Sequence, residues 1–259
     1  MKNIAFCILL ALCSTICFAQ NKNLIVNLNF NTGDVTKVAH RDFFDTNAQH
    51  VSDSVLYKGE KSVRFEVKSS NPGDKGIRSE FAFASESNSE RWYTLSIYPP
   101  STYLPDPEPE IVTQWHNVPD VNLGEQSLSP SLGLFVQNGH WNVHVLWDTA
   151  RVTKQGHWMG SIGTDLGPVS LNTWTTWVFH IRFSYKNDGL VQIYKNGVKV
   201  YERKGPNDFN DAALPYWKVG IYKWVYRDHN PADHKRNQRV LFYSHIKEGD
   251  EKSTYNDFK

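Results

Sequence analysis

The chain has 259 residues, with 28 Lys and Arg against 27 Asp and Glu, and its formal net charge is +1. A near-neutral charge argues against a non-specific nucleic-acid binder, which needs a basic excess. The 9 Trp, 12 Tyr and 14 Phe argue against a disordered chain, because such chains are poor in aromatic residues. The length is sufficient for one large domain with a sizeable core.

Residues 1–19 have the pattern of a secretory signal peptide. A basic start at Lys2 precedes an apolar run over Ile4–Phe18, and Ala19 offers a small residue for cleavage. The run is short for a membrane span, and polar residues follow it directly. We therefore expect cleavage near Ala19 and a secreted or periplasmic protein, a single domain of residues 20–259 without a membrane span.

All three cysteines of the chain, at positions 7, 13 and 17, fall within this signal. The mature protein then has no cysteine, which excludes disulfides, thiolate metal sites and a cysteine nucleophile. Because Lys2 is the only charged residue of the signal, the mature chain balances 27 basic against 27 acidic residues.

Alternation of apolar and polar residues predicts β-strands along the body of the chain. The clearest strands are residues 62–67, 140–147, 174–184, 190–194 and 198–201. Asn196-Gly197, between the last two, is a strong hairpin signal. No amphipathic helix longer than about two turns is predicted. The pattern predicts an all-β fold, a β-jelly roll sandwich of two antiparallel sheets.

Two long connections interrupt the strands. Residues 99–109 are rich in proline and acidic residues, and strand patterning continues on both sides, which favours a surface connection over a domain linker. Residues 148–170 form a second long stretch that contains glycine. Long loops on a sandwich often bind ligands or act as lids.

Three segments combine polar side chains with the strand alternation. Arg78 and Glu80 share one face of the first segment, and Gln114 and His116 share one face of the second. The third segment presents on one face Tyr216, Lys218, Gly220, Tyr222 and Trp224. A glycine within a strand often marks the close approach of a ligand or of another backbone.

These residue types suit abstraction of the C5 proton of a uronic acid sugar. Negative charge then builds on the neighbouring carboxylate, where a guanidinium and an amide stabilise it. A His or a tyrosinate can take the proton, and a Tyr hydroxyl can protonate the leaving glycosidic oxygen. Such a β-elimination requires no metal or other cofactor.

The same three segments are similar to three sequence blocks of the jelly-roll polysaccharide lyases, alginate lyases among them. The resemblance to the heparin-lyase-I-like and glucuronan-lyase group covers more of the chain than the resemblance to alginate lyases, and it extends over most of residues 60–245. The resemblance implies a secreted lyase with a substrate groove across a concave sheet. It implies that Arg78 and Gln114 neutralise the carboxylate, that His116 is base or charge neutraliser, and that Tyr222 is acid, or both acid and base.

Two positions depart from the alginate-lyase pattern. Trp115 stands where those enzymes have an aliphatic residue, and Trp224 stands where a Gln often closes the third block. Both departures favour a glucuronan-like polymer over alginate. Some relatives bind a structural calcium through a C-terminal acidic residue, so the resemblance makes a structural calcium possible here as well. Ser244 and His245 occupy that region in this chain, so the metal ligands stay unassigned.

Further side chains are expected to contact the anionic polysaccharide. The substrate-binding set predicted beside the catalytic residues is Glu80, His144, Tyr216, Lys218, Trp224 and Arg239. Trp141, Trp147 and Trp217 are expected to fill the sandwich instead. His229, Asp233 and His234 resemble a metal cluster by type, but a polar loop with mixed charges is the favoured interpretation.

Other functions stay open at this point. A carbohydrate-binding sandwich would stack sugars on Trp115, Trp217 and Trp224 without chemistry. A glycoside hydrolase would need two carboxylates about 5–10 Å apart, and Glu80 and Glu110 are the only acidic candidates beside the three segments. A lyase acting on alginate or a heparin-type glycosaminoglycan is a third alternative. We expect a monomer.

Overall fold

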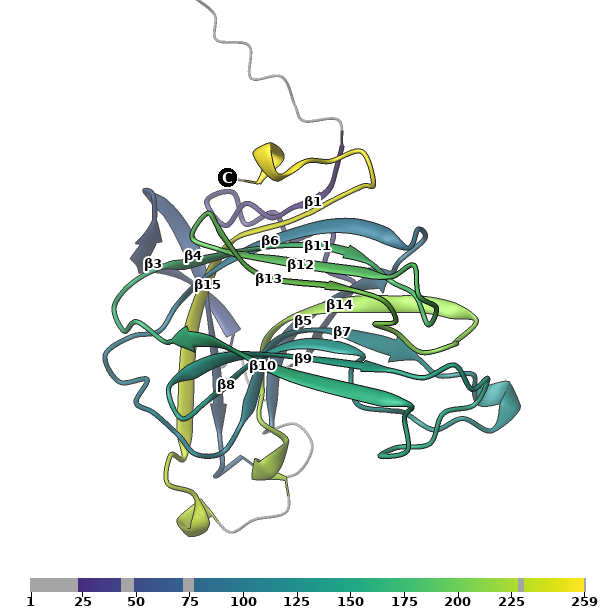
Figure 1. Ribbon diagram of the computed structural model, residues 1–259. Helices are drawn as coiled ribbons and strands as arrows, with labels where there is room; N and C mark the ends of the chain where they lie inside the picture. The colour runs from purple at the N-terminus through teal and green to yellow at the C-terminus, as the bar shows by residue number, and fades with distance from the viewer. Residues whose placement is uncertain (1–22, 43–48, 72–76, 228–230, 259) are drawn as a thin grey trace, which may run out of the picture.

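Two antiparallel sheets packed face to face form the body of the protein (Figure 1). The computed structural model describes residues 23–42, 49–71, 77–227 and 231–258, so the predicted signal peptide lies outside the described residues. The all-β prediction is confirmed: in the described ranges the only helical segments are the 3-10 turns η1 (Val121–Leu123), η2 (Trp224–Tyr226), η3 (Pro231–Asp233) and η4 (Tyr255–Asp257). None of these turns has the length or apolar character to cross a membrane.

The first sheet has the strand order β13-β12-β11-β6-β15-β4-β3, and β1 pairs with β15. Its strands are β1 (Leu24–Asn27), β3 (Gln49–Tyr57), β4 (Glu60–Lys68), β6 (Glu90–Tyr98), β11 (Thr175–Arg182), β12 (Leu190–Lys195), β13 (Val198–Lys204) and β15 (Gln238–Gly249). The second sheet has the order β10-β9-β8-β7-β14-β5-β2. Its strands are β2 (His40–Asp42), β5 (Arg78–Ser85), β7 (Glu110–Val118), β8 (Leu132–Gln137), β9 (His140–Trp147), β10 (Gly160–Pro168) and β14 (Ala213–Tyr222).

The strand predictions agree closely with the structure. The segment predicted over 140–147 coincides with β9, and the predicted hairpin joins β12 to β13. Asn196 and Gly197 have φ angles of 49° and 88°, as a tight two-residue hairpin turn requires. The loop predicted over 148–170 is wrong in its second half, because β10 pairs there with β9. This edge strand is largely exposed and rich in glycine, so it has no apolar alternation to detect.

Aromatic side chains fill the space between the sheets. Trp141 and Trp217 are fully buried, as predicted, and Trp147 packs partly buried at the margin of the core. Trp115 and Trp217, from neighbouring strands of the second sheet, stack with ring centroids 6.4 Å apart. Burial of each such side chain contributes about 1.5–3 kcal/mol to folding. Since these two rings point inward, the side chains that alternate with them point to the opposite face of the sheet.

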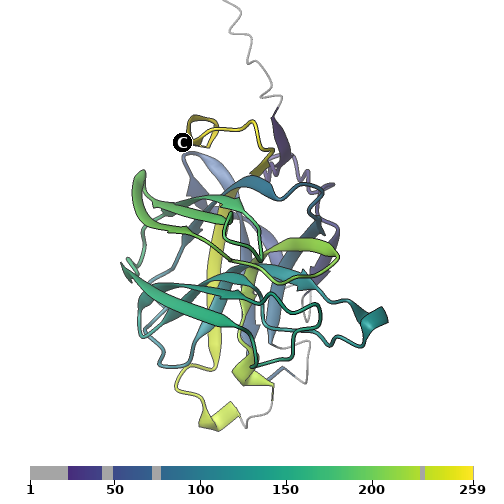
Figure 2. The same cartoon turned by 45° about the vertical axis from the view of Figure 1, so that its right-hand side comes forward.

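The proline-rich connection of residues 99–109 runs between β6 and β7 and is anchored rather than fully solvated. Tyr103 and Asp106 are buried within it. The Tyr103 hydroxyl donates a hydrogen bond to Glu110, and Lys223 forms an ion pair with Asp106 at 2.9 Å. The connection therefore packs against the end of β14, where Tyr222 is followed by Lys223. Figure 2 shows that, by contrast, η1 projects away from the sandwich.

Candidate functional site

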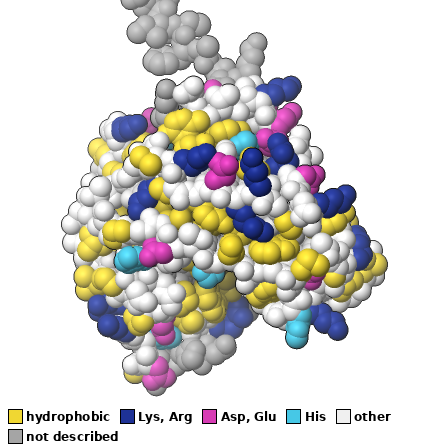
Figure 3. Space-filling model, viewed as in Figure 1, with side chains coloured by type: hydrophobic (Ala, Val, Ile, Leu, Met, Phe, Trp, Pro, Cys, Tyr) yellow, Lys and Arg dark blue, Asp and Glu magenta, His cyan; other side chains and the backbone are white. Residues whose placement is uncertain are grey.

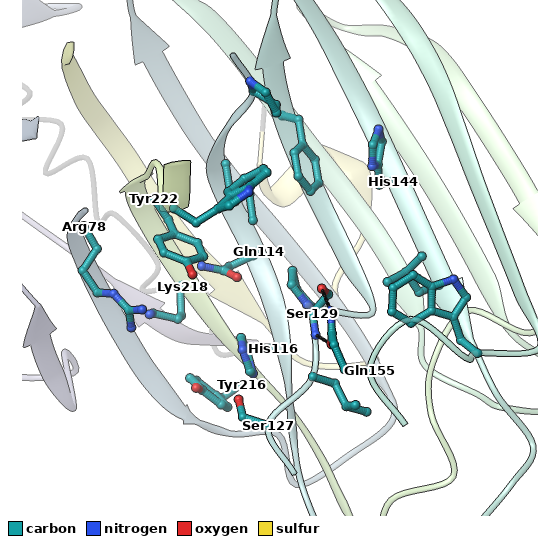
Figure 4. A pocket seen from close by; sticks show the side chains of 18 of the residues that line it. Arg78, Gln114, His116, Ser127, Ser129, His144, Gln155, Tyr216, Lys218 and Tyr222 are labelled. Carbon is teal, nitrogen blue, oxygen red and sulfur yellow. Dashed lines mark hydrogen bonds between the residues drawn. The ribbon is translucent and has the colours of Figure 1, made fainter. Parts of the chain in front are cut away.

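A groove of about 770 Å³ opens on the outer face of the second sheet (Figure 4). Its floor is built by five adjacent strands, β5, β14, β7, β8 and β9. They contribute, in that order, Arg78; Tyr216, Lys218 and Tyr222; Gln114 and His116; Phe135; and His144. The loop before β8 and the loop between β9 and β10 line one side of the groove. Ser129 and Gln155 join these loops by two reciprocal hydrogen bonds, each of 2.8 Å.

Antiparallel register brings the predicted catalytic residues together. Tyr222 pairs with Arg78 across β14 and β5, while Lys218 pairs with Gln114 across β14 and β7. The Arg78 guanidinium lies over the Tyr222 ring, 4.7 Å from its centroid. His116 lies two residues beyond Gln114 and contacts the Tyr216 ring, with centroids 5.5 Å apart. The structure thus gathers Arg78, Gln114, His116 and Tyr222 in one part of the groove.

Glu80 lies beneath this floor and not in the groove. Its side chain is 0% exposed and, unlike Gln114 and Lys218, is not part of the groove lining, so the prediction that it contacts substrate is wrong. One carboxylate oxygen lies 2.6 Å from the Lys218 ammonium, and the other accepts a hydrogen bond of 2.6 Å from the Gln114 amide. Strand alternation identified the correct face of β5, but it does not report how deep a side chain lies.

Arg239 is also misplaced by the sequence prediction. It lies on β15 of the first sheet, and it is 2% exposed. Its guanidinium is 2.8 Å from a Glu110 oxygen and 3.8 Å from the centre of the Tyr103 ring. These contacts make Arg239 a buried structural cation, and the prediction of a substrate contact is wrong.

His116 is held as a neutral imidazole with one defined tautomer. Its Nδ1 lies 3.0 Å from the Asn117 carbonyl, which can only accept, so Nδ1 carries the proton and Nε2 keeps a free lone pair. Burial lowers the pKa of His116, and the cations Lys218 and Arg78 lower it further, against the raising effects of that backbone hydrogen bond and of Glu80. The imidazole is therefore available at neutral pH as a proton acceptor.

This electrostatic arrangement predicts the acid limb of the pH profile. If His116 must be neutral, kcat/KM rises with pH through a pKa below the ordinary value of 6.5. Replacing Lys218 with Met removes a neighbouring positive charge, so the pKa of His116 rises and the acid limb moves to higher pH. Steady-state rates across pH measure the shift. Lys199→Met, on the exposed surface of β13, is the control, and a limb that stays in place in Lys218→Met would contradict the role of His116.

Aromatic rings form the β8 and β9 side of the groove. Phe135 stacks on His144 with centroids 4.3 Å apart, and Trp224 approaches Phe135 edge-on at 6.2 Å. Burial lowers the pKa of His144, so this side is uncharged at neutral pH. Sequence reasoning missed Phe135. The available signal was Gly133, on the same face two residues earlier: a Cβ there would lie 2.8 Å from the Phe135 ring, so the glycine lets the ring lie flat over the sheet.

The groove carries a local excess of positive charge. Within the described part of the chain, its lining includes Arg78, Lys218 and Arg227 and no Asp or Glu. Elsewhere, as on the face seen in Figure 3, acidic and basic side chains are interspersed. The arrangement can bind an anion beside a neutral imidazole and a phenol, and the described lining residues include no pair of carboxylates.

The two C-terminal positions considered for a structural calcium, Ser244 and His245, carry no carboxylate. The Ser244 hydroxyl donates to the Lys61 carbonyl, and the His245 imidazole bonds the Phe258 carbonyl. The loop with His229 and His234 was the other segment considered for a metal. His234 lies 2.9 Å from a Glu108 oxygen, and His229 is outside the described residues. Within the described residues of the two segments, these contacts form no oxygen-rich ligand set of the kind that calcium prefers.

Another part of the described chain gathers three carboxylates. Asp120, Glu125 and Asp211 have oxygens within 4.8 Å of one another. Burial and the neighbouring carboxylates raise the pKa of Asp211 to about 7. Arg151 lies 2.6 Å from Asp120, so a guanidinium already balances part of the negative charge. The cluster therefore has an internal counter-charge, and calcium binding stays a prediction.

Comparison with known proteins agrees with this geometry. The crystal structure of an endo-β-1,4-glucuronan lyase from the fungus Trichoderma reesei is similar, with a TM-score of 0.71 and 20% sequence identity over 86% of this chain and 94% of that chain. The alginate lyase Aly36B has a TM-score of 0.58 and 13% identity, over 87% and 96% of the two chains. A marine PL-14 alginate lyase from Aplysia kurodai has a TM-score of 0.53 and 11% identity, over 78% and 87%. At these identities the likeness establishes a shared fold.

The sequence comparison goes further than the fold. A search of curated protein sequences gives no match. The family described as "Polysaccharide lyase", however, matches the chain over residues 30–247, which include every strand that builds the groove floor. The chain therefore belongs to the polysaccharide lyase family, and it is an enzyme of that class with a β-jelly roll fold.

Proposed function

We propose that the protein cleaves a uronic-acid-containing polysaccharide by β-elimination and leaves an unsaturated uronate end. The observation that carries the proposal is the lining of the groove. Its described residues include the cations Arg78, Lys218 and Arg227 and no carboxylate. Such a lining attracts a polyanion. A glucuronan-like polymer is the favoured substrate.

The residues around Arg78 supply what the elimination requires. A uronate carboxylate placed between Arg78 and Gln114 receives charge-assisted hydrogen bonds, which strengthen as negative charge develops on it in the transition state. This makes the C5 proton more acidic. His116, through its free Nε2, or Tyr222 removes the proton, and the Tyr222 hydroxyl donates a proton to the departing glycosidic oxygen. The C4–O bond breaks, a C4–C5 double bond forms, and no water is consumed.

The two alternatives from other functional classes have less support. A hydrolase needs two carboxylates flanking the scissile bond, whereas Glu80 and Glu110 are both buried outside the groove. A binding module that stacks sugars on Trp115, Trp217 and Trp224 would lose two of these platforms, since Trp115 and Trp217 are 0% exposed. Trp224 alone of the three lines the groove.

The choice among uronate polymers rests on weaker grounds. The departures at Trp115 and Trp224 from the alginate-lyase pattern favour glucuronan, and alginate or a heparin-type glycosaminoglycan is the alternative. The predicted signal peptide of residues 1–19 supports secretion, which would place the enzyme where such polymers occur. We further propose that the enzyme acts as a monomer.

The test follows the new double bond. The protein without residues 1–19 is incubated with polyglucuronate, alginate, heparin and hyaluronan, and ultraviolet absorbance and reducing ends are followed together. We expect both to rise in parallel, fastest with polyglucuronate, because each elimination creates one unsaturated end and one reducing end. Reducing ends without absorbance would indicate hydrolysis. Binding without either signal on any uronate polymer would indicate a binding module.

A further inference from the structure

The buried carboxylate of Glu80 connects two groove residues that come from different strands. It lies 2.6 Å from the Lys218 ammonium on β14 and accepts a hydrogen bond of 2.6 Å from the Gln114 amide on β7. β14 lies between β5 and β7, so the Glu80 side chain must pass over β14 to reach Gln114. The residue paired with Glu80 on β14 is Gly220, which has no side chain to obstruct that path.

The orientation of the Gln114 amide depends on this contact. In Figure 4 the amide nitrogen is directed to the side of the groove that carries Tyr222, Lys218 and Arg78, so a partly positive NH2 group lies on the side of two cations. The bare cations would favour the opposite orientation, with the amide oxygen toward them. Among the described residues, the NH2 group donates its hydrogen bond to the Glu80 carboxylate, which stabilises the group in this orientation. The amide oxygen has no hydrogen-bond partner among the described residues, so no second contact competes for the orientation.

Glu80 also sets the charge of this part of the groove. Arg78 and Lys218 are both cationic, and Glu80 compensates one of their two charges from below. One net positive charge remains, which matches the single carboxylate of one uronate residue. Excess positive charge would bind substrate and transition state alike, and such uniform binding lowers KM without raising kcat.

We propose that Glu80 is a positioning residue that holds the Gln114 amide as a donor toward the substrate carboxylate and limits the subsite to one net positive charge. The proposal rests on the proposed β-elimination of a uronate polymer. It predicts separate effects on the two kinetic constants, which a merely structural role would not produce.

The central experiment compares Glu80→Gln with Glu80→Gln/Lys218→Met. In Glu80→Gln we expect kcat to fall ~10- to 100-fold, because a charge-assisted hydrogen bond that orients the donor is lost. KM should fall as well, because the charge of Lys218 is no longer compensated. In the double variant the net charge is restored, so KM should return toward the wild-type value while kcat stays low. Glu66→Gln, at a buried and ion-paired glutamate of β4, is the matched control.

Two results would overturn the proposal. One is a Glu80→Gln enzyme with the kinetic constants of Glu66→Gln, and the other is a KM that rises in Glu80→Gln. If Glu80→Gln fails to fold, Glu80→Asp serves instead: it keeps the charge but is too short to hold both partners, so kcat should fall with KM unchanged. A Glu80→Asp enzyme with wild-type kcat contradicts the positioning role.

A binding measurement separates this proposal from the proposed function. Electrophoretic mobility in gels containing polyglucuronate reports affinity whether or not the polymer is cleaved. If the wild-type protein cleaves no uronate polymer, the proposed function fails, yet stronger retardation of Glu80→Gln than of wild type still supports the charge-limiting role of Glu80. Equal or weaker retardation overturns that role.

Discussion

Replacing Tyr222 with Phe is expected to lower kcat by about 10²–10⁴-fold, because the change removes the hydroxyl that we propose protonates the leaving oxygen. The Tyr222 ring stays in place to pack against the Arg78 guanidinium, 4.7 Å from the ring centroid, and against Trp224, with ring centroids 5.9 Å apart. Polymer affinity should therefore stay near the wild-type value. Steady-state absorbance assays and gel retardation measure the two effects separately.

The matched control for Tyr222→Phe is Tyr201→Phe. Tyr201 lies on β13 of the first sheet and outside the groove lining, so loss of its hydroxyl should leave the kinetic constants unchanged. Wild-type kcat in Tyr222→Phe would contradict the assigned role. A parallel loss of binding and kcat would assign Tyr222 to substrate binding rather than to proton transfer.

Replacing Gly220 with Ala is expected to lower the free energy of unfolding by about 3 kcal/mol or more, since two effects add. Gly220 has a φ of 139°, a conformation that residues with a side chain rarely adopt. A Cβ there would lie 2.1 Å from the Ser79 carbonyl oxygen and 2.7 Å from the Glu80 Cα. The contacts are with backbone, so β14 and β5 must separate. Urea unfolding measures the loss, and activity should fall because Lys218 and Tyr222 lie on the displaced strand.

Gly59→Ala isolates the backbone effect. Gly59 also has a positive φ, 86°, but no atom lies within 4 Å of a Cβ built there. Its replacement should cost only about 1 kcal/mol, the usual conformational penalty. Equal unfolding energies for the two variants would show that the close approach of β5 to Gly220 is not maintained in solution.

The sequence was sufficient for the fold class and for most of the candidate site, because both depend on local alternation. In an antiparallel sheet, residues on the same face of adjacent strands become neighbours, and the three segments with Arg78, Gln114 and Tyr222 follow this rule. Alternation does not specify which sheet a strand joins, which is why Arg239 was misplaced. It does not specify depth either, which is why the substrate contact predicted for Glu80 is wrong.

The features that the sequence did not reveal depend on contacts distant in the chain. β10 has few apolar residues and is recognised only by its pairing with β9. Phe135 becomes part of the groove floor because Gly133 leaves room for its ring. The carboxylates of Asp120 and Asp211 lie close together although the residues are 91 positions apart in sequence. Asp120 precedes β8 in the chain, and Asp211 follows β13. No local pattern signals such proximity.

The insertion of β14 between β5 and β7 makes the groove a late product of folding. Residues 78, 114 and 222 are far apart in the chain, and they meet only when the penultimate strand enters the middle of a sheet whose other members precede it. During synthesis, therefore, the proposed catalytic residues cannot come together until nearly the whole polypeptide has been made. Long-range pairing of this kind is slow, so recovery of activity after dilution from denaturant should report the closing of this gap rather than the first collapse of the chain.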